Sequence, residues 1–132
     1  MRLAAPLLLV AVALAGCGND DPNPSAPGEG ALAALVVTVD EDGKGGAPAR
    51  ELRLNCAEPT DSPACGAAAG ISARDLAPTP PDTACTQLFG GPETATIKGQ
   101  IRGEDVDATF SRSDGCEIER WKRVQPLLDE VQ

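Results

Sequence analysis

The sequence predicts a small α+β domain: an antiparallel β-sheet of four to five strands, with two helices on one face and two disulfides. Four segments alternate apolar and polar residues, as strands with one buried face do. An alanine-rich segment and a segment near the C-terminus show helical spacing instead. The aromatic residues are only one Trp and two Phe, so the core is thin and cross-links between cysteines add needed stability.

The N-terminus has the features of an export signal. A basic start is followed by an apolar segment, residues 3–15, which is too short to span a bilayer stably. Leu14-Ala15-Gly16-Cys17 resembles a bacterial lipobox, in which the cysteine thiol receives a diacylglycerol before cleavage. We therefore expect residues 1–16 to be a lipoprotein signal peptide and Cys17 to be lipidated, on the extracellular side of the cytoplasmic membrane. The alternative is an ordinary signal peptide followed by a chance cysteine.

The composition after the signal peptide narrows the classes of function. Residues 17–30 are rich in Pro, Gly and Asp without apolar periodicity, which predicts a disordered tether before a folded domain at residues 31–132. Loss of Arg2 with the signal leaves 10 basic and 20 acidic residues, a charge of −10, which opposes nucleic-acid binding. The chain contains no histidine, and no nucleophile–base pair or cofactor motif can be assembled. We expect neither an enzyme nor a cofactor or metal site.

The remaining cysteines predict covalent cross-links. With Cys17 assigned to the lipid, Cys56, Cys65, Cys85 and Cys116 remain, and four cysteines allow three pairings. They contain no C-x-x-C spacing for zinc, and an oxidising compartment favours two disulfides. Cys56–Cys65 is the local choice, which leaves Cys85–Cys116 as a long-range bridge. In the loop-entropy description, these bridges contribute roughly 2.5 and 3.5 kcal/mol to stability.

Two strands are expected first. Residues 35–39 and 51–56 alternate in the manner of strands, and the acidic, glycine-rich segment 40–46 between them has turn chemistry. That segment lacks the third acidic ligand and the distal glutamate of a calcium-binding loop. The side chains expected to point inward are Leu35, Val37, Val39, Leu52, Leu54 and Cys56.

A helix is expected next. Ser62 is a good N-cap and Pro63 suits the first helical position, so one helix should run as far as Leu76. Its expected buried face comprises Ala64, Ala67, Ala68 and Ile71, although two glycines within it disfavour helix. The proline-rich residues 77–82 then predict a stiff, extended connector that leads to Cys85.

The clearest pattern is a hairpin. Residues 94–101 and 106–111 alternate strictly around a turn placed at Gly103-Glu104. Residues 117–124 predict a short helix that Pro126 disturbs or ends. The inward side chains of these segments are expected to be Ala95, Ile97, Gly99, Ile101, Val106, Ala108, Phe110, Ile118 and Trp121.

The order and spacing of these features resemble the subtilisin inhibitor-like family of actinobacterial proteins. The likeness covers residues 35–121 and rests on the cysteine spacing, on Gly99-x-x-x-Gly103-x-x-Val106-x-x-x-Phe110, and on Gly115-Cys116-Glu117. It implies a five-stranded antiparallel sheet with two helices and the disulfides Cys56–Cys65 and Cys85–Cys116. It also implies that the chain binds an extracellular subtilisin-like serine protease in the manner of a substrate.

The resemblance also assigns the protease-binding loop. The scissile bond would lie between Gln87 and Leu88, with Gln87 in the primary specificity pocket. A loop that is already extended loses little entropy on binding, and its cut ends stay close enough to rejoin. The whole reactive loop would comprise Ala84, Cys85, Thr86, Gln87, Leu88 and Phe89.

The chain also differs from the family. Gln87 is polar where members carry a large apolar or basic residue, and Thr86 replaces a frequent proline. The segment Gly90-Gly91-Pro92 inserts a residue, and its glycines are expected to loosen the far side of the loop. The segment around Pro126 lacks the family's hydrophobic last strand, which disfavours a dimer. The alternative function is therefore a non-inhibitory binding module of the cell envelope on the same scaffold.

Overall fold

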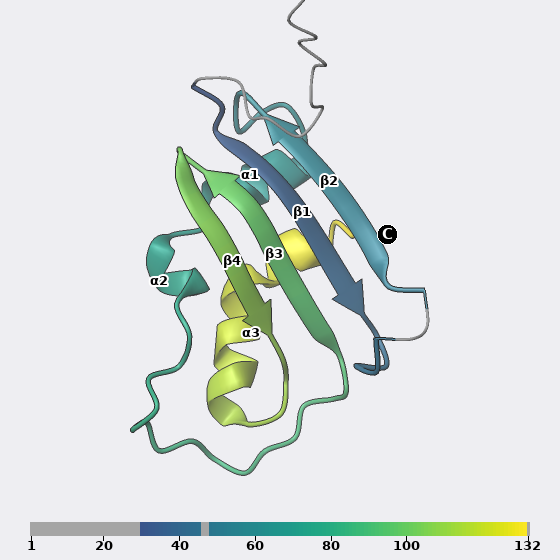
Figure 1. Cartoon of the computed structure of the whole chain (residues 1–132), viewed down its shortest axis with the longest axis vertical. Helices are drawn as coiled ribbons and strands as arrows, with labels where there is room; N and C mark the ends of the chain where they lie inside the picture. The colour runs from purple at the N-terminus through teal and green to yellow at the C-terminus, as the bar shows by residue number, and fades with distance from the viewer. Residues whose placement is uncertain (1–29, 46–47, 132) are drawn as a thin grey trace, which may run out of the picture.

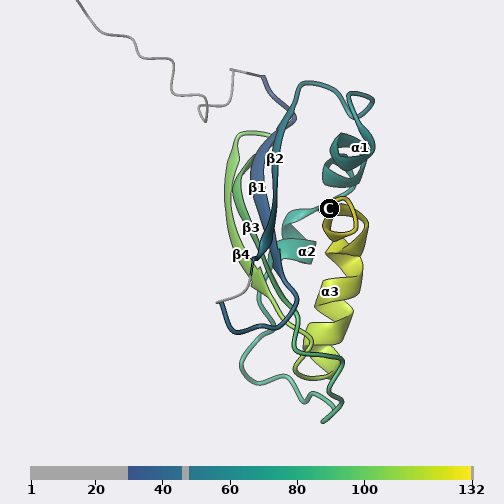
Figure 2. The same cartoon turned by 90° about the vertical axis from the view of Figure 1, so that its right-hand side faces the viewer.

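The computed structural model describes residues 30–45 and 48–131, which form two layers: a four-stranded antiparallel sheet and three helices that cover one of its faces (Figures 1 and 2). The order of the strands is β2-β1-β3-β4. The predicted fold class is confirmed, with four strands in the described ranges. The expected signal peptide, the expected lipidation at Cys17 and the expected tether up to residue 29 lie outside the described residues. The elements are β1 (Ala33–Asp40), β2 (Arg50–Cys56), α1 (Pro63–Ala69), α2 (Ala73–Leu76), β3 (Thr94–Ile101), β4 (Glu104–Phe110) and α3 (Gly115–Leu128).

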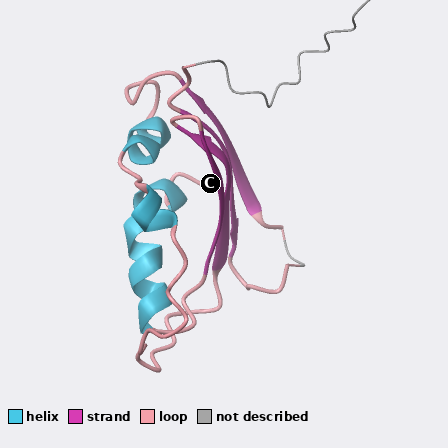
Figure 3. Cartoon of the chain, turned by 60° about the vertical axis from the view of Figure 1, so that its left-hand side comes forward, coloured by secondary structure: helices cyan, strands magenta, loops and turns pink. Residues whose placement is uncertain are grey.

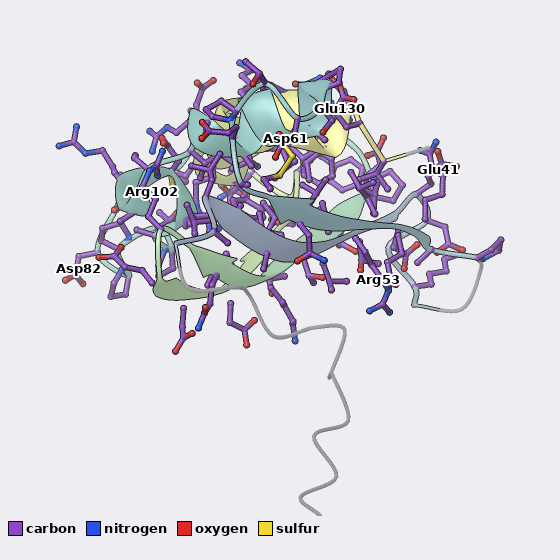
Figure 4. The ribbon with its side chains drawn as sticks, turned by 90° about the horizontal axis from the view of Figure 1, so that it is seen from above. Glu41, Arg53, Asp61, Asp82, Arg102 and Glu130 are labelled. Carbon is purple, nitrogen blue, oxygen red and sulfur yellow. A yellow bond between two sulfur atoms is a disulfide. The ribbon has the colours of Figure 1, made fainter. Side chains whose placement is uncertain are left out.

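The core lies between the sheet and the helices (Figure 3). Val37 in the central strand β1 pairs with Leu52 of β2 on one side and with Ile97 of β3 on the other. Alternation places every second residue of these strands on the helix face, where Val37 and Ile97 are fully buried. Trp121 is 9% exposed, so its expected place in the core is confirmed. The opposite face of the sheet carries polar side chains such as Arg53 (Figure 4).

Both predicted disulfides are present. Cys56 and Cys65 join the end of β2 to α1, with 5.6 Å between their Cα atoms, and both are buried. Cys85 and Cys116 join the segment after α2 to the first turn of α3, with a Cα–Cα distance of 5.4 Å. The first bridge therefore belongs to the core, whereas the second holds a surface segment.

The prediction of a single helix up to Leu76 is wrong, because the structure has two helices in this segment, α1 and α2. Helix α1 ends at Ala69, and the next residue, Gly70, is a poor helix former whose amide donates to the carbonyl of Ala67 at 3.1 Å. Ser72 then begins a new helix: its backbone amide and its hydroxyl both donate to Oδ2 of Asp75, at 2.9 and 2.5 Å. The Asp75 carboxylate thus satisfies the Ser72 amide, which favours a new helix start at this position over a continuous helix.

The final helix is longer than predicted at both ends. Asp114 caps α3, because its Oδ1 accepts a hydrogen bond from the amide of Glu117 at 3.0 Å. Pro126 lies within the helix and does not end it. Its ring is exposed, so it removes one solvent-facing hydrogen bond, while Leu127 and Leu128 are buried and hold the last turn against the core. This helix occupies the part of the chain that would have formed a fifth strand.

The hairpin turn lies one residue earlier than predicted. Ile101 pairs with Glu104, so the turn consists of Arg102 and Gly103, which have φ angles of 50° and 78°. Positive φ at both positions defines a type I′ turn, whose twist matches that of the two strands. The Arg102 amide donates to the carbonyl of Leu32 at 2.8 Å, and its guanidinium donates to the carbonyl of Ile71 at 3.1 Å. These bonds compensate for the unfavourable backbone conformation of Arg102 by joining the turn to β1 and the helix layer.

Candidate functional site

The predicted loop lies in the long connection between α2 and β3. Residues 77–93 run beside α3 towards its first turn and then cross to the start of β3 (Figures 1 and 2). The connector 77–82 is proline-rich, as noted, but it bends at its end, where the Thr83 amide donates to the carbonyl of Pro80 at 3.1 Å. This bend directs the chain across the end of the domain, where the candidate loop residues follow.

The tip of the loop is exposed. Leu88 is 63% exposed and Phe89 is 71% exposed, and Gln87 beside them also faces solvent. Leu88 and Phe89 are the exposed large hydrophobic residues of the described chain. Single exposed apolar residues are common, but two in succession at the tip of an anchored loop indicate a contact surface.

The upstream side of the tip is attached to the start of α3. The Gly115 amide donates to the carbonyl of Thr86 at 3.0 Å, and the disulfide Cys85–Cys116 lies directly beside this bond. The close approach requires glycine, because a Cβ on Gly115 would lie 2.0 Å from Oγ1 of Thr86. A covalent bond and a backbone hydrogen bond thus fix adjacent loop residues on one helix.

The downstream side is attached to the segment after β4. The Gly90 amide donates to the carbonyl of Arg112 at 2.7 Å. A Cβ on Gly90 would lie 2.9 Å from Cγ1 of Ile118, so the residue packs closely against α3. The sequence suggested that Gly90 loosens the loop, but in the structure its lack of a side chain permits this attachment. Three residues, 87–89, therefore lie between two backbone anchors.

Arg112 also supports the exit of the loop. Its Nη1 lies 3.1 Å from Oε1 of Glu93, and its guanidinium carbon lies 6.0 Å from the centroid of the Trp121 ring. Gly91 lies against the same carboxylate, at a φ of 145° that strongly favours glycine. The residue that accepts the Gly90 hydrogen bond is therefore itself held by an ion pair and by the core.

A second network fixes the connector before the loop. Nε of Arg120 donates to the carbonyl of Ala77 at 2.9 Å, and its Nη1 donates to Oε2 of Glu117 at 2.7 Å. The other oxygen of Glu117 accepts a hydrogen bond from Oγ1 of Thr79 at 2.8 Å. Arg120 is only 7% exposed, and it bonds to carbonyls that no local sequence pattern reveals.

The turn after β1 packs against the last residues of the connection. Hydrogen bonds hold the pKa of Asp40 below its ordinary value, first among them one from the Gly45 amide to Oδ2 at 2.6 Å. Oδ1 accepts from the amides of Asp42 and Gly43, both at 3.1 Å. A Cβ on Gly43 would lie 2.0 Å from the carbonyl oxygen of Pro92, so the turn and the loop exit are in close contact. Both oxygens of Asp40 are thus engaged by the backbone.

One group of potential metal ligands lies beside the loop. Atoms of Cys85, Asp114 and Cys116 come within 4.8 Å of one another. Both sulfurs are in the disulfide, and metals are bound by the thiolate instead. Of the three residues, only Asp114 therefore offers a free ligand atom, which is too few for a metal site.

The arrangement can hold a short peptide exposed to solvent, with both of its ends fixed to the domain. Ala84, Cys85 and the four residues that follow form one continuous strip along this end of the molecule, and Ala84 is exposed at its beginning. No family model, curated protein or solved structure matches the chain. Across residues 30–45 and 48–131, no helix has the length and apolar character needed to cross a membrane.

Proposed function

We propose that this domain inhibits subtilisin-type serine endopeptidases by binding them in the manner of a substrate through residues 84–89. The observation that carries the proposal is the position of the exposed tip between two backbone anchors, Gly115 to Thr86 and Arg112 to Gly90. The resemblance in cysteine spacing supports the same function. The proposed activity is binding, and no residue of the chain is assigned a catalytic role.

Preorganisation gives the loop its affinity. A free peptide loses roughly 0.5–1.5 kcal/mol for each side chain that it orders on binding, whereas this loop is already ordered by the domain. Its exposed backbone can pair with an edge of the protease active site. In this complex Gln87 enters the primary specificity pocket, Ala84 enters the apolar pocket three residues upstream, and Leu88 lies beyond the scissile bond.

The same anchors oppose net cleavage. Attack by the protease serine on the carbonyl of Gln87 forms an acyl-enzyme and releases the α-amine of Leu88. That amine stays close to the ester, because Gly90 two residues downstream is bonded to Arg112. The high effective concentration of the amine favours its attack on the ester, which re-forms the peptide bond and frees the serine. Cleavage is therefore reversible within the complex.

The proposed location is the extracellular side of the cytoplasmic membrane. Two disulfides are consistent with an oxidising, extracellular environment. Lipidation of Cys17 would anchor the chain there. Mass spectrometry of the protein from membranes tests this assignment: a diacylglycerol on an N-terminal Cys17 supports it, and an unmodified mature N-terminus contradicts it.

Titration of subtilisin with the mature chain, made soluble by Cys17→Ser, tests the inhibition. We expect activity to fall linearly to zero at one equivalent, with the inhibitor recovered intact. Rapid accumulation of chain cut between Gln87 and Leu88, or undiminished protease activity at excess inhibitor, would exclude the proposed function.

A non-inhibitory binding module is the second candidate. It is favoured by Phe89, whose 71% exposed ring would suit an apolar pocket on a partner other than a protease. Crosslinking from position 89 in intact cells distinguishes the two candidates. Capture of a serine protease supports inhibition, and consistent capture of a non-protease envelope protein supports the module.

A further inference from the structure

A groove lies directly behind the exposed loop. Its volume is about 660 Å³, and its walls are formed by the segment 77–88 on one side and by α3 on the other. Leu88, which is part of the exposed tip, also lines the groove, so the two surfaces are continuous. The apolar part of its lining comes from Ala77, Pro78, Pro80, Ala84, Leu88 and Ile118.

The rim of the groove is basic, in contrast to the rest of the molecule. Arg74 of α2 and Lys122 and Arg123 of α3 line it, and all three are exposed. Lys122 pairs with Glu119 at 2.7 Å, but neither arginine forms an ion pair with another described residue. The carboxylate of Asp75 accepts two hydrogen bonds from Ser72 but keeps its negative charge, which also acts on Arg74 and Arg123. Three basic side chains at the rim, Arg74, Lys122 and Arg123, face two nearby carboxylates, those of Asp75 and Glu119. The rim therefore keeps a small excess of positive charge, on a chain whose net charge is −9.

The loop alone is too small for a stable complex. Stable interfaces bury about 800 Å² on each partner, from 20–30 residues, which is several times what six loop residues supply. A protease seated on Leu88 must also cover neighbouring surface, and the groove adjoins that residue. The groove is therefore placed to supply part of the missing area.

We propose that the groove is a second contact surface for the protease, and that it receives an acidic surface loop of the enzyme with an apolar side chain at its tip. This inference rests on the proposed function. Arg74 and Arg123 would pair with the carboxylates of that loop, and the apolar lining would receive the tip. Charges at the rim of an interface act mainly on association rate and on the choice of partner. The groove would thus select among proteases that share a primary pocket but differ in surface charge.

The double variant Arg74→Glu/Arg123→Glu in the soluble Cys17→Ser chain tests the proposal. The matched control is Arg53→Glu/Lys98→Glu, on exposed positions of the opposite face of the sheet. Both variants change the net charge equally, so a difference between them reports the local position of the charges. With an acidic subtilisin-type protease at low salt, we expect the groove variant to associate about tenfold more slowly than the control. The difference should vanish at high salt, because screening removes it.

Three outcomes overturn the proposal. The first is equal association rates for the two variants, with urea midpoints showing that both are folded. The second is a dimer of the parent chain that the groove variant dissociates while inhibition is unchanged, which assigns the groove to a second copy. The third is a parent chain that does not inhibit any subtilisin-type protease. That result removes the proposed function and this inference with it, whereas the first two leave inhibition intact.

Discussion

The guanidinium carbon of Arg120 lies 4.8 Å from the centroid of the Phe110 ring. Phe110 is fully buried and Arg120 nearly so, and the charge is compensated by the carboxylate of Glu117. The same guanidinium donates to the carbonyl of Thr109 at 3.2 Å and to that of Ala77 at 2.9 Å. Arg120, which lies on α3, thus bonds to the end of β4 and to the start of the connector that leads to the candidate loop.

Replacing Arg120 by Met is expected to lower the free energy of unfolding by about 3 kcal/mol, because Glu117 and three backbone carbonyls lose a buried partner. Urea denaturation measures the loss. The control is Arg123→Met on the exposed side of the same helix, which should change stability by less than about 0.5 kcal/mol. Equal losses for the two variants would show that the Arg120 network contributes nothing specific.

If the proposed inhibition holds, alanine at Gly90 or Gly115 is expected to weaken it and to let the protease cleave the loop. The added Cβ would lie 2.9 Å from Ile118 at position 90 and 2.0 Å from Thr86 at position 115, so each anchor must shift. We expect the inhibition constant to rise at least about tenfold, which corresponds to the loss of one hydrogen bond of roughly 1.4 kcal/mol. The control Gly70→Ala adds a Cβ with an ordinary contact of 3.4 Å and should leave inhibition unchanged.

Removing either disulfide is expected to lower stability, but only removal of Cys85–Cys116 is expected to affect the loop. The double variant Cys85→Ala/Cys116→Ala loses about 3.5 kcal/mol of stability and should be cleaved faster between Gln87 and Leu88. The double variant Cys56→Ala/Cys65→Ala also loses stability, by about 2.5 kcal/mol or more, but keeps both anchors of the tip. Mass spectrometry of the cleavage products, at a temperature where both variants are folded, should show rapid cutting in the first variant only.

Leucine at position 87 is expected to strengthen inhibition. Burying a leucine side chain in an apolar pocket is worth about 1.5–3 kcal/mol, whereas glutamine must lose water from its amide. The inhibition constant of Gln87→Leu against a subtilisin with an apolar pocket should therefore fall about tenfold or more. Gln100→Leu places the same change on the sheet and serves as the control. A weaker Gln87→Leu inhibitor would mean that another residue occupies the pocket.

Acid is expected to remove the contribution of Asp40. Its pKa is lowered from the ordinary value of 3.8, chiefly by the hydrogen bond from the Gly45 amide. A lowered pKa in the folded state stabilises the protein above the unfolded pKa, and this stabilisation is lost as the pH falls through the folded value. The urea midpoint of Asp40→Asn should lie below that of the parent at neutral pH and converge with it in strong acid. A difference independent of pH would contradict the assignment.

Much of the fold could be predicted from local patterns. Alternation in β3 and β4 follows directly from having one buried face, and the capped start at Ser62-Pro63 correctly marked α1. The division before α2 was missed because the continuous alanine run outweighed a short capping pattern at Ser72. The length of α3 was missed because the cost of Pro126 inside the helix is offset by the combined burial of Leu127 and Leu128.

The candidate loop was predictable only in part. Its position follows from the cysteine spacing, but its anchors join residues that are distant in sequence: Thr86 to Gly115 and Gly90 to Arg112. No sequence pattern in one segment reveals the carbonyl that another segment will present. The burial of Arg120 was hidden for the same reason, because its partners at Ala77 and Thr109 become neighbours only after folding.

The loop and the beginning of the domain occupy opposite poles (Figure 1). Strand β1 starts at Ala33 beside the β3–β4 turn, and its eight residues extend about 26 Å towards the pole where the loop lies. A lipid on Cys17 would attach the chain to the membrane at the end of the domain where β1 begins, and the candidate loop lies at the other end. If the proposed inhibition holds, a protease would then bind the domain at the end opposite its attachment to the membrane.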